Sequence, residues 1–535
     1  MKQNELPSEE MYMSGKSLYP LSISLAAKLA KEFDGRLRIS YSGGADYYNI
    51  ERIVDAGIWP VTVATTLLKP GGYQRLTQMA KLLDKENAPF EKVDAESAGK
   101  LAEEAVKDPH HVKAMKPLPS RKMKKEVPLM DCFVAPCKEG CPIHQDITTY
   151  LQLVGEEKYE EAMEVITEKN PLPFITGTIC AHNCMSKCTR NFYETPVHIR
   201  EMKLKAAENG YEALLEKLPV PAVTKAGKAA VIGGGPAGMA AAYFLRKGGM
   251  EVTLFEAKES LGGVVRHVIP PFRISEDAIE KDAEILRKMQ VDIHCNTKLE
   301  SLEELKKQGY TKIVLAVGAP VQGSLKLESG MPKNALEFLA EFKQTDGKVS
   351  LGKHVVVIGG GNTAMDTARA AKRNAGVEHV YLIYRRTRRY MPADEEELVM
   401  ALEDGVEFKE LLSPVKLENG QLFCKVMQLS DYDVSGRRGV TETGETVWVP
   451  ADTVIAAVGE KVPTDWYQAN GLAVSEKGRL YVDEKTLKTS DDNVYAAGDG
   501  LYGPATVVEA IRDGRKVAEA IAGEVLACDF DKLAE

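Results

Sequence analysis

The sequence predicts an α/β protein with two Rossmann-like domains, preceded by a helical segment and by a partial (β/α)-barrel-like segment. Two observations predict the Rossmann-like domains: a strand, a glycine-rich turn and a helix follow one another near Gly233 and again near Gly359. A third observation, six cysteines between positions 132 and 188, separates the helical segment from them. Since 535 residues exceed a single ordinary core, several domains are expected.

Residues 1–105 alternate strand-like and helix-like runs, which is typical of α/β structure. The strand-like runs are Leu37–Ser40 and Val61–Ala64, and the helix-like runs are Ala26–Glu32 and Tyr73–Leu83. Residues 106–130 are rich in Pro, Lys and His and are predicted to be a linker.

Composition and charge indicate which partners and which cellular compartment to expect. The net charge of −9 argues against nucleic acid as a partner. No apolar run approaches the roughly 20 residues needed to span a bilayer, so no membrane partner is expected. The N-terminus is polar and acidic, unlike a signal peptide, and the chain is therefore expected to be cytoplasmic.

The first glycine-rich turn has every part of a dinucleotide-binding unit. Gly233 permits a tight turn, Gly235 lets the backbone approach a pyrophosphate, and Gly238 lets helix and strand pack closely. The helix N-terminus faces the phosphate charge. Glu256 ends the second strand of this unit, 21 residues after Gly235, and is placed to bind a ribose.

The second turn has the form Gly-x-Gly-x-x-Ala, with Gly359, Gly361 and Ala364. Its second strand ends in Arg385 and Arg386 instead of an acid. Guanidinium groups at this place suit a 2′-phosphate, so NADP is favoured over NAD. The alternative is that both arginines are ordinary exposed charges.

Near the C-terminus, Gly498 and Asp499 follow a short apolar strand and precede a helix that starts near Thr506. This stretch resembles the two-dinucleotide-binding flavoprotein superfamily, in which the matching Gly-Asp holds the ribityl–pyrophosphate part of FAD. The helix would point its positive end at the flavin. Two further strands end in Gly318 and Gly459 and are expected to carry the chain between the two domains.

The resemblance implies an FAD domain in two parts, residues 226–325 and 455–535, with an NADPH domain at 350–450 inserted between them. A thiol–disulfide reductase of this superfamily would carry a cysteine pair after Leu261–Gly263, where this chain has Val264–His267. The electrons must therefore leave the flavin by a route other than a cysteine pair.

The clustered cysteines are expected to bind the groups that accept these electrons. Thiolates at such spacing, with a proline after one of them, favour iron–sulfur clusters over structural zinc, which remains the alternative. The predicted metal ligands are Cys132, Cys137, Cys141, Cys180, Cys184 and Cys188.

Residues 131–525 are similar to the small chain of bacterial glutamate synthase and to the matching segment of dihydropyrimidine dehydrogenase. The resemblance is closer still to the family described as selenate reductase subunits, on the stretches around Asp131–Cys137 and Ile269–Ile274. It implies a helical iron–sulfur domain at 131–222 with one or two 4Fe–4S clusters. Cys132, Cys137 and Cys188 would serve one cluster, and the other three cysteines would serve the second.

The chain departs from the glutamate synthase pattern at two positions. Leu129 stands where that pattern has a further cysteine, and Lys203 stands where a Gln or Glu ligand is expected on the helix after the cysteines. The fourth ligand of each cluster is therefore left open, with Glu201, Asp131 and solvent as candidates.

Together these features predict an NADPH-dependent oxidoreductase that passes hydride to FAD and single electrons through the clusters to a redox partner protein or subunit. No catalytic side chain is required, because the cofactors carry the chemistry. The alternatives are a ferredoxin–NADP reductase, a transhydrogenase or a glutamate synthase small chain running in either direction, and a non-catalytic assembly scaffold. The residues expected to bind the dinucleotides are Gly233, Gly235, Pro236, Ala237, Gly238, Glu256, Gly263, Arg273, Gly318, Gly359, Gly361, Asn362, Thr363, Ala364, Arg385, Arg386, Gly459, Gly498, Asp499, Thr506 and Val507.

Two glycine-containing loops in residues 1–105, at Ser42–Gly44 and at Lys69–Gly72, look like the phosphate loops of a flavin-binding (β/α)8 barrel. A whole barrel needs about 250 residues. We therefore expect this segment to bind no FMN and to pack as a small α/β unit.

Overall fold

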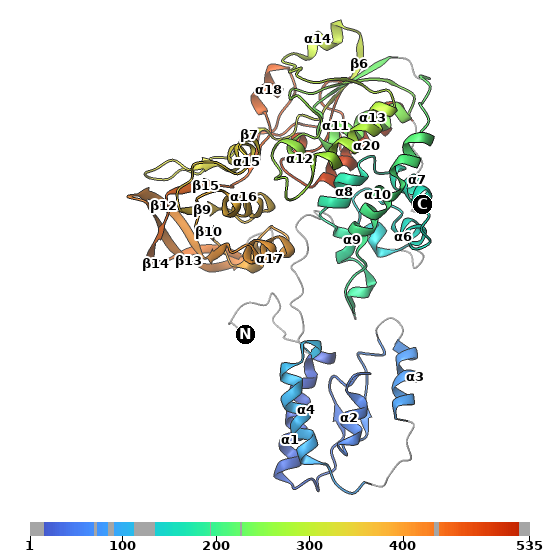
Figure 1. Cartoon of the computed structure of the whole chain (residues 1–535), viewed down its shortest axis with the longest axis vertical. Helices are drawn as coiled ribbons and strands as arrows, with labels where there is room; N and C mark the ends of the chain where they lie inside the picture. The colour runs from blue at the N-terminus through green and yellow to red at the C-terminus, as the bar shows by residue number, and fades with distance from the viewer. Residues whose placement is uncertain are drawn as a thin grey trace. The chain divides into compact units, whose positions relative to one another are not determined.

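The structure is a computed structural model that describes residues 15–68, 72–83, 90–111, 134–192, 194–224, 227–432 and 438–523. It divides into two compact units, Met1–Pro117 and Leu118–Glu535, each drawn in Figure 1. The division falls inside the predicted linker. Cys132, a predicted cluster ligand, and Asp131, a candidate for a fourth ligand, lie outside the described residues.

The N-terminal unit contains two short parallel strands separated in the chain by a helix. Strand β1 (Tyr41–Ser42) pairs with β2 (Val61–Thr62), and α2 (Ile50–Asp55) lies between them in sequence. The run Leu37–Ser40, predicted as a strand, is not part of one; Ser40 would have to pair with Pro60, which has no N–H to donate. The other helices are α1 (Tyr19–Glu32), α3 (Gly72–Leu82) and α4 (Ala95–Lys107).

The loop after β1 packs directly against α1. Gly43 and Gly44 both have positive φ angles, and a Cβ on Gly44 would lie 2.6 Å from the backbone nitrogen of Tyr19. The carbonyl of Gly43 accepts hydrogen bonds from Ser22 Oγ at 2.7 Å and Tyr41 Oη at 3.0 Å. Helix α1 therefore packs closely against these two glycines, and the expected absence of FMN stays a prediction.

The helical segment is built around α10 (Ile199–Lys217), which packs against α6, α7 and α8. Glycines allow this close approach: a Cβ on Gly177 would lie 2.9 Å from Leu204 Cα, and one on Gly210 would lie 2.4 Å from Tyr159 O. The other helices are α5 (Pro136–Glu139), α6 (Ile147–Gly155), α7 (Tyr159–Thr167), α8 (Pro173–Ile179) and α9 (Asn183–Ser186).

A buried carboxylate joins this segment to the first Rossmann-like domain. Asp282 is fully buried and accepts hydrogen bonds from the backbone N–H groups of Phe174 at 3.1 Å and Ile175 at 2.8 Å. It therefore satisfies donors at the N-terminal end of α8 from another domain. This contact holds α8, and the cysteine that follows it, against the dinucleotide domain.

The first Rossmann-like domain contains a parallel sheet in the order β17-β6-β3-β4-β5. Its last strand in the chain, β17, pairs with β6, which gives the predicted discontinuous domain. The strands are β3 (Lys228–Ile232), β4 (Glu251–Phe255), β5 (Asp292–His294), β6 (Tyr310–Leu315) and β17 (Val494–Ala496). The helices are α11 (Pro236–Lys247), α12 (Val264–His267), α13 (Glu276–Lys288), α14 (Leu302–Lys307), α18 (Thr464–Ala469), α19 (Asp499–Tyr502) and α20 (Val507–Ala522).

The second Rossmann-like domain also has a parallel sheet, in the order β11-β10-β9-β15-β8. One face of it packs against an antiparallel sheet, β12-β13-β14, through a shared apolar core that includes Val356, Ile383, Leu422 and Cys424 (Figure 1). The strands are β8 (Lys333–Asn334), β9 (His354–Ile358), β10 (His379–Tyr384), β11 (Glu407–Glu410), β12 (Leu412–Glu418), β13 (Gln421–Tyr432), β14 (Arg438–Pro450) and β15 (Thr453–Ala456). The helices are α15 (Ala335–Gln344), α16 (Asn362–Arg373) and α17 (Glu395–Glu403).

The second domain extends beyond its predicted limits of 350–450. Strand β8 and helix α15 precede residue 350, and β15 follows residue 450, yet both strands belong to its sheet. The chain crosses between the domains at β7 (Val321–Gln322) and β16 (Glu460–Lys461), which pair with each other. Strand β15 belongs to the sheet of the second domain, and the crossing at β16 follows it directly. The predicted limits were too narrow because a short apolar strand does not reveal which sheet it joins.

The helices that the structure describes include none long and apolar enough to cross a membrane.

Candidate functional site

The first glycine turn connects β3 to α11 and requires glycine at two positions. Gly233 has a φ of +107°, and a Cβ there would lie 2.3 Å from Ala316 O. A Cβ on Gly238 would lie 1.8 Å from Gly233 O. Both contacts are too short for any side chain, so these glycines set the close packing of strand, turn and helix.

Gly235 has open space where its side chain would be. A Cβ built there would meet only Gly263 Cα, at 3.8 Å. Gly263, which has a φ of +53°, packs against Gly235 on one side of this space, since a Cβ on Gly263 would lie 2.8 Å from Gly235 Cα. The open side lies at the start of α11, where Pro236 is the first helical residue. A pyrophosphate fits this cradle of backbone at a helix N-terminus.

Glu256 lies beside the turn with both carboxylate oxygens held. Its Oε2 accepts from the N–H of Gly234 at 2.6 Å, and its Oε1 accepts from the N–H of Lys258 at 2.8 Å. The side chain is buried. Each oxygen retains a second lone pair that can accept from a hydroxyl group. The role of Glu256 in binding a ribose stays a prediction.

Gly498 and Asp499 bring the C-terminal segment against the same turn. A Cβ on Gly498 would lie 2.7 Å from the Cβ of Ala237. Burial raises the pKa of Asp499 to about 6, and its Oδ1 accepts from the N–H of Ala505 at 3.0 Å. An acceptor held this way beside the first turn suits the hydroxyl groups of a dinucleotide.

Helix α20 starts directly after Thr506 in a capping box. Thr506 Oγ1 accepts from the N–H of Glu509 at 3.4 Å, and Glu509 Oε2 accepts from the N–H of Thr506 at 3.1 Å. The predicted contact residues Thr506 and Val507 therefore form the first turn of a well-capped helix. The helix start is fixed in place by these bonds.

The second glycine turn connects β9 to α16 and repeats the first. A Cβ on Gly359, whose φ is +156°, would lie 2.5 Å from Ala457 O, whereas a Cβ on Gly361 would meet nothing within 4 Å. The space at Gly361 is therefore free for a second pyrophosphate. Asn362 is held by Asp394, whose N–H donates to Asn362 Oδ1 at 3.1 Å. The other predicted residues here lie on α16, which contains Thr363 and the buried Ala364.

Two predicted glycines end inner strands of the two sheets. Gly318 follows β6 and Gly459 follows β15, with φ angles of +69° and +103°. A Cβ on either one would meet nothing within 4 Å. Each therefore supplies a left-handed turn with free space at the edge where the neighbouring glycine turn lies.

The structure separates the two arginines predicted to bind a 2′-phosphate. Arg385 is exposed directly after β10. Arg386 is buried, and its Nε donates to the carbonyl of Arg438 on β14 at 2.8 Å. Arg386 therefore supports the antiparallel sheet, and Arg385 is the exposed cation of the pair.

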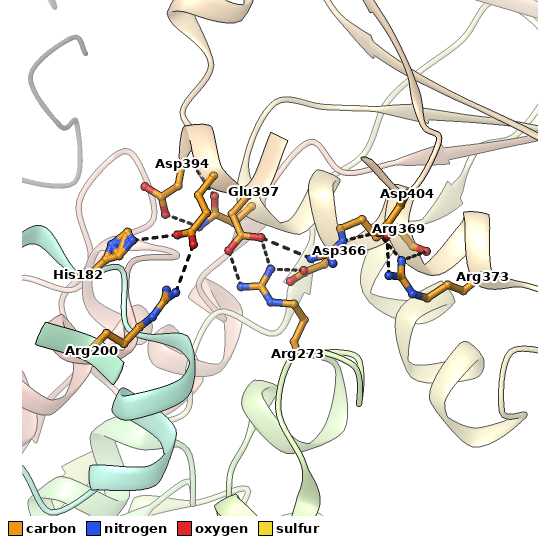
Figure 2. Close-up of polar contacts among 11 residues, drawn as sticks. His182, Arg200, Arg273, Asp366, Arg369, Arg373, Asp394, Glu397 and Asp404 are labelled. Atoms are coloured by element: carbon orange, nitrogen blue, oxygen red, sulfur yellow. Dashed lines mark hydrogen bonds and ion pairs between the residues drawn. The ribbon is translucent and has the colours of Figure 1, made fainter. Parts of the chain in front are cut away.

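Arg273, predicted to contact a cofactor, instead forms ion pairs between the two Rossmann-like domains. Its guanidinium donates to Asp366 at 2.6 Å and to both oxygens of Glu397, which lies on α17 (Figure 2). All three side chains are at most 14% exposed. The resemblance could not reveal this role, because the partners lie 93 and 124 residues away in the sequence.

Helix α17 also contacts the cysteine-containing segment. The neighbouring Glu396 accepts from His182 Nε2 at 3.1 Å and pairs with Arg200 at 3.5 Å (Figure 2). The same helix therefore contacts the helical segment through Glu396 and the first Rossmann-like domain through Glu397.

Three of the predicted ligand cysteines surround one cavity. Cys141, Cys180 and Cys184 are buried and line it together, and Lys203 of α10 lines it as well. Burial raises the pKa of Cys141, while Lys203 and the backbone N–H groups of Gln145 and Ile143 act in the opposite direction. The thiols are thus brought together as the resemblance implied.

The remaining cysteines form a second group closer to the surface. Cys137 and Cys188 are half-buried and close enough for Cys188 to raise the pKa of Cys137, although burial is the larger cause. Their expected partner, Cys132, is outside the described residues. In the described part of the chain, no three His, Cys, Asp or Glu side chains converge as the ligands of a single metal ion would.

Buried polar atoms without partners show what the first cavity fits. Gln145 Oε1, Tyr150 Oη and Asn183 Nδ2 make no hydrogen bond, and all three residues line the cavity. The sulfides and thiolates of a 4Fe–4S cluster would accept from the hydroxyl and the amide N–H groups, and separate thiols around a cavity match its corners. These three residues were missed by the sequence analysis, because nothing local distinguishes them from ordinary loop and helix residues.

Glu201, a candidate ligand from the sequence, points elsewhere. Its carboxylate accepts from His198 Nδ1 at 3.0 Å, and its side chain is 62% exposed. It does not line the cavity.

Three known families match the chain in succession. Residues 1–113 match the N-terminal TIM-barrel domain of the oxidoreductase YgfK. Residues 118–213 match domain II of dihydropyrimidine dehydrogenase, described with a 4Fe–4S cluster. Residues 227–514, more than half of the chain, match the pyridine nucleotide-disulphide oxidoreductases. These matches confirm the predicted fold class.

Individual relatives agree with these matches. The chain is 43% identical over 524 residues to the oxidoreductase YgfK of Escherichia coli K12, which covers 96% of this chain and 50% of that protein. It is 34% identical over 433 residues to the NADPH-Fe(3+) oxidoreductase subunit beta of Geobacter sulfurreducens, covering 73% of this chain and 64% of that protein. It is 33% identical over 420 residues to the glutamate synthase (NADPH) small chain of Azospirillum brasilense, covering 73% and 86%.

The chain spans about half the length of the first of these relatives and most of the length of the third. The resemblance to the glutamate synthase small chain that its motifs predicted is confirmed, as are an FAD/NAD(P) domain and a 4Fe–4S domain. The chain therefore belongs to the pyridine nucleotide-disulphide oxidoreductase family, with a match to a 4Fe–4S domain ahead of the segment that the family covers.

Proposed function

We propose that this chain passes hydride from NADPH to FAD and single electrons through 4Fe–4S clusters to a redox partner protein or subunit. When bound, the flavin would supply the chemistry that accepts two electrons as hydride and releases them one at a time, and the clusters would carry the single electrons. The residues described above would bind and position these groups.

One observation carries the proposal: the start of α20 brings the predicted flavin site next to the cavity lined by cysteines. Val507 lies at the capped start of the helix, in the predicted flavin site. Val508, the next residue, lines the cavity that contains Cys141, Cys180 and Cys184. Adjacent residues of one capped helix would therefore lie at the two sites. Such a short separation suits direct electron transfer between the flavin and the inner cluster.

The exposure of the cysteines supports a direction outward from the flavin. The three thiols beside Val508 are buried, whereas Cys137 and Cys188 are half-buried. An inner cluster would therefore receive electrons from the flavin, and an outer cluster would deliver them to a partner at the surface.

The donor side is supported by the second glycine turn and by Arg385. Gly361 leaves space for a pyrophosphate, and the exposed Arg385 lies after the second strand, where a 2′-phosphate is recognised. Relatives named as an NADPH-Fe(3+) oxidoreductase subunit and as an NADP(+)-dependent formate dehydrogenase subunit point to the same nucleotide and to a multi-subunit setting. We place the reaction in the cytoplasm, where reducing conditions keep ligand thiols free.

The test is anaerobic oxidation of NADPH with cytochrome c, a one-electron acceptor too large to reach a buried flavin. The wild-type chain should reduce it, and Cys184→Ser should abolish that transfer while NADPH still bleaches the flavin. Cys295→Ser is the matched control, because Cys295 is half-buried and lies outside both cysteine groups.

Two outcomes would count against the proposal. Equal cytochrome reduction by the wild type and Cys184→Ser would remove the inner cluster from the path. A flavin-loaded chain whose flavin NADPH does not reduce would favour the scaffold alternative.

A further inference from the structure

The cavity lined by Cys141, Cys180 and Cys184 has three thiols, whereas a 4Fe–4S cluster has four corners to be bound. Lys203 also reaches this cavity, but a charged ammonium group has no lone pair to offer iron. Among the residues that the structure describes, the other side-chain oxygens in its lining belong to Gln145, Tyr150 and Asn183. The fourth ligand must therefore be sought among these or from solvent.

Gln145 is held so that its amide oxygen has a defined direction. Its Nε2 donates to the carbonyl of Ile166 at 2.9 Å, and its side chain is 1% exposed. Because a carbonyl can only accept, the NH2 group must face Ile166 and Oε1 must lie on the other side of the amide. That oxygen is buried and makes no hydrogen bond.

The backbone ties the same residue to the cluster thiols. Gln145 lies four residues after Cys141, and its N–H donates to the sulfur of Cys141. The residue is thus fixed at two points, by Ile166 through the side chain and by Cys141 through the backbone. An oxygen fixed in this way keeps one direction beside the cavity that Gln145 lines.

We infer that Gln145 Oε1 is the fourth ligand of the cluster held by Cys141, Cys180 and Cys184. An amide oxygen is a neutral ligand. With it, the cluster and its ligands carry one negative charge fewer than they would with a fourth thiolate. Tyr150 and Asn183 are donors to the cluster sulfur atoms in this arrangement, and Lys203 supplies a positive charge beside it. Glu201, exposed and paired with His198, takes no part.

The inference concerns how the cluster is held and is independent of the direction of electron flow, so it can fail while the proposed function stands. The test compares Gln145→Leu with Gln145→Glu. Both remove the hydrogen bond to Ile166, but only the glutamate retains an oxygen that can bind iron. Tyr150→Phe is the matched control, because it removes another unpartnered polar atom from the same cavity.

After mild oxidation with ferricyanide, Gln145→Leu should contain about one iron per chain fewer than the wild type and show the EPR signal of a three-iron cluster. Gln145→Glu and Tyr150→Phe should retain the iron content of the wild type. Equal iron loss in the leucine and glutamate variants would mean that only the bond to Ile166 matters. Unchanged iron in the leucine variant would also overturn the inference.

Mössbauer spectra of the wild type and Gln145→Glu keep the inference testable if the leucine variant does not fold. Replacing a ligating amide oxygen with a carboxylate oxygen should alter the signal of one iron site. Identical spectra would show that position 145 does not bind iron.

Discussion

Arg273 and Glu397 form a two-pronged ion pair that joins the two Rossmann-like domains. Both terminal nitrogens of Arg273 donate to the carboxylate of Glu397, and one of them also donates to Asp366 (Figure 2). The ring of Phe272, next to Arg273 in the chain, packs against Arg373 of α16, whose guanidinium carbon lies 4.3 Å from the ring centroid. The pair therefore fixes how the second domain contacts the first.

Removing Arg273 should strongly destabilise this contact. Arg273→Met leaves the buried carboxylates of Asp366 and Glu397 without their shared cation, and breaking a buried ion pair costs about 3–5 kcal/mol. The free energy of unfolding from denaturant titration measures this cost. The double variant Arg273→Met with Glu397→Met should recover part of the loss; purely additive losses would contradict a coupled pair.

Asp366 should make stability depend on pH. Burial raises its pKa from 3.8 to about 6, although Arg273 acts in the opposite direction. Because the folded pKa lies above the unfolded value, the folded state binds the proton more tightly, and the resulting stability is lost as pH rises through about 6. Between pH 5 and pH 8 the wild type should lose about 1.4 kcal/mol relative to Asp366→Asn, which does not titrate. Denaturant titrations of both proteins at the two pH values test this; a difference independent of pH would contradict it.

Two glycines of the first turn should respond oppositely to alanine. At Gly238 a Cβ would lie 1.8 Å from Gly233 O, so Gly238→Ala should prevent this domain from folding. At Gly235 the nearest atom would be 3.8 Å away, so Gly235→Ala should fold but fill the space of a pyrophosphate. Circular dichroism and the flavin content of the purified proteins distinguish the two effects. Stoichiometric FAD in Gly235→Ala would show that the phosphate lies elsewhere.

Arg385 should carry the preference for NADPH. Arg385→Ala removes an exposed cation whose charge-assisted hydrogen bonds contribute about 1.5–3 kcal/mol each, equivalent to at least a tenfold fall in kcat/KM for NADPH. NADH should be affected little. Arg386→Ala is the comparison, because Arg386 is buried against Arg438 and its loss should lower stability more than nucleotide preference. An unchanged NADPH to NADH ratio in Arg385→Ala would contradict this assignment.

The parts that were predicted from sequence depend on local patterns. Gly233 and Gly359 lie in turns whose strand, helix and glycine spacing are contiguous in the chain, so the pattern alone indicates the fold. The three cysteines around the first cavity were grouped by resemblance, and the structure brings them together.

The parts that were missed depend on residues far apart in sequence. Arg386 binds a carbonyl 52 residues away, and Arg273 binds a carboxylate 124 residues away. Gln145, in the loop before α6, is oriented by Ile166, which lies 21 residues later on helix α7. Neither spacing nor composition indicates these partners, because the contacts form only when distant helices and strands pack together.

The central claim is that electrons from NADPH pass through the flavin to the clusters. The most direct measurement is an anaerobic titration of the purified chain with NADPH, in which flavin absorbance and EPR spectra are recorded on the same samples and dithionite serves as the reference reductant. We predict that NADPH bleaches the flavin and then produces the EPR signal of a reduced 4Fe–4S cluster. A bleached flavin beside clusters that stay oxidised with NADPH, yet are reduced by dithionite, would contradict the account.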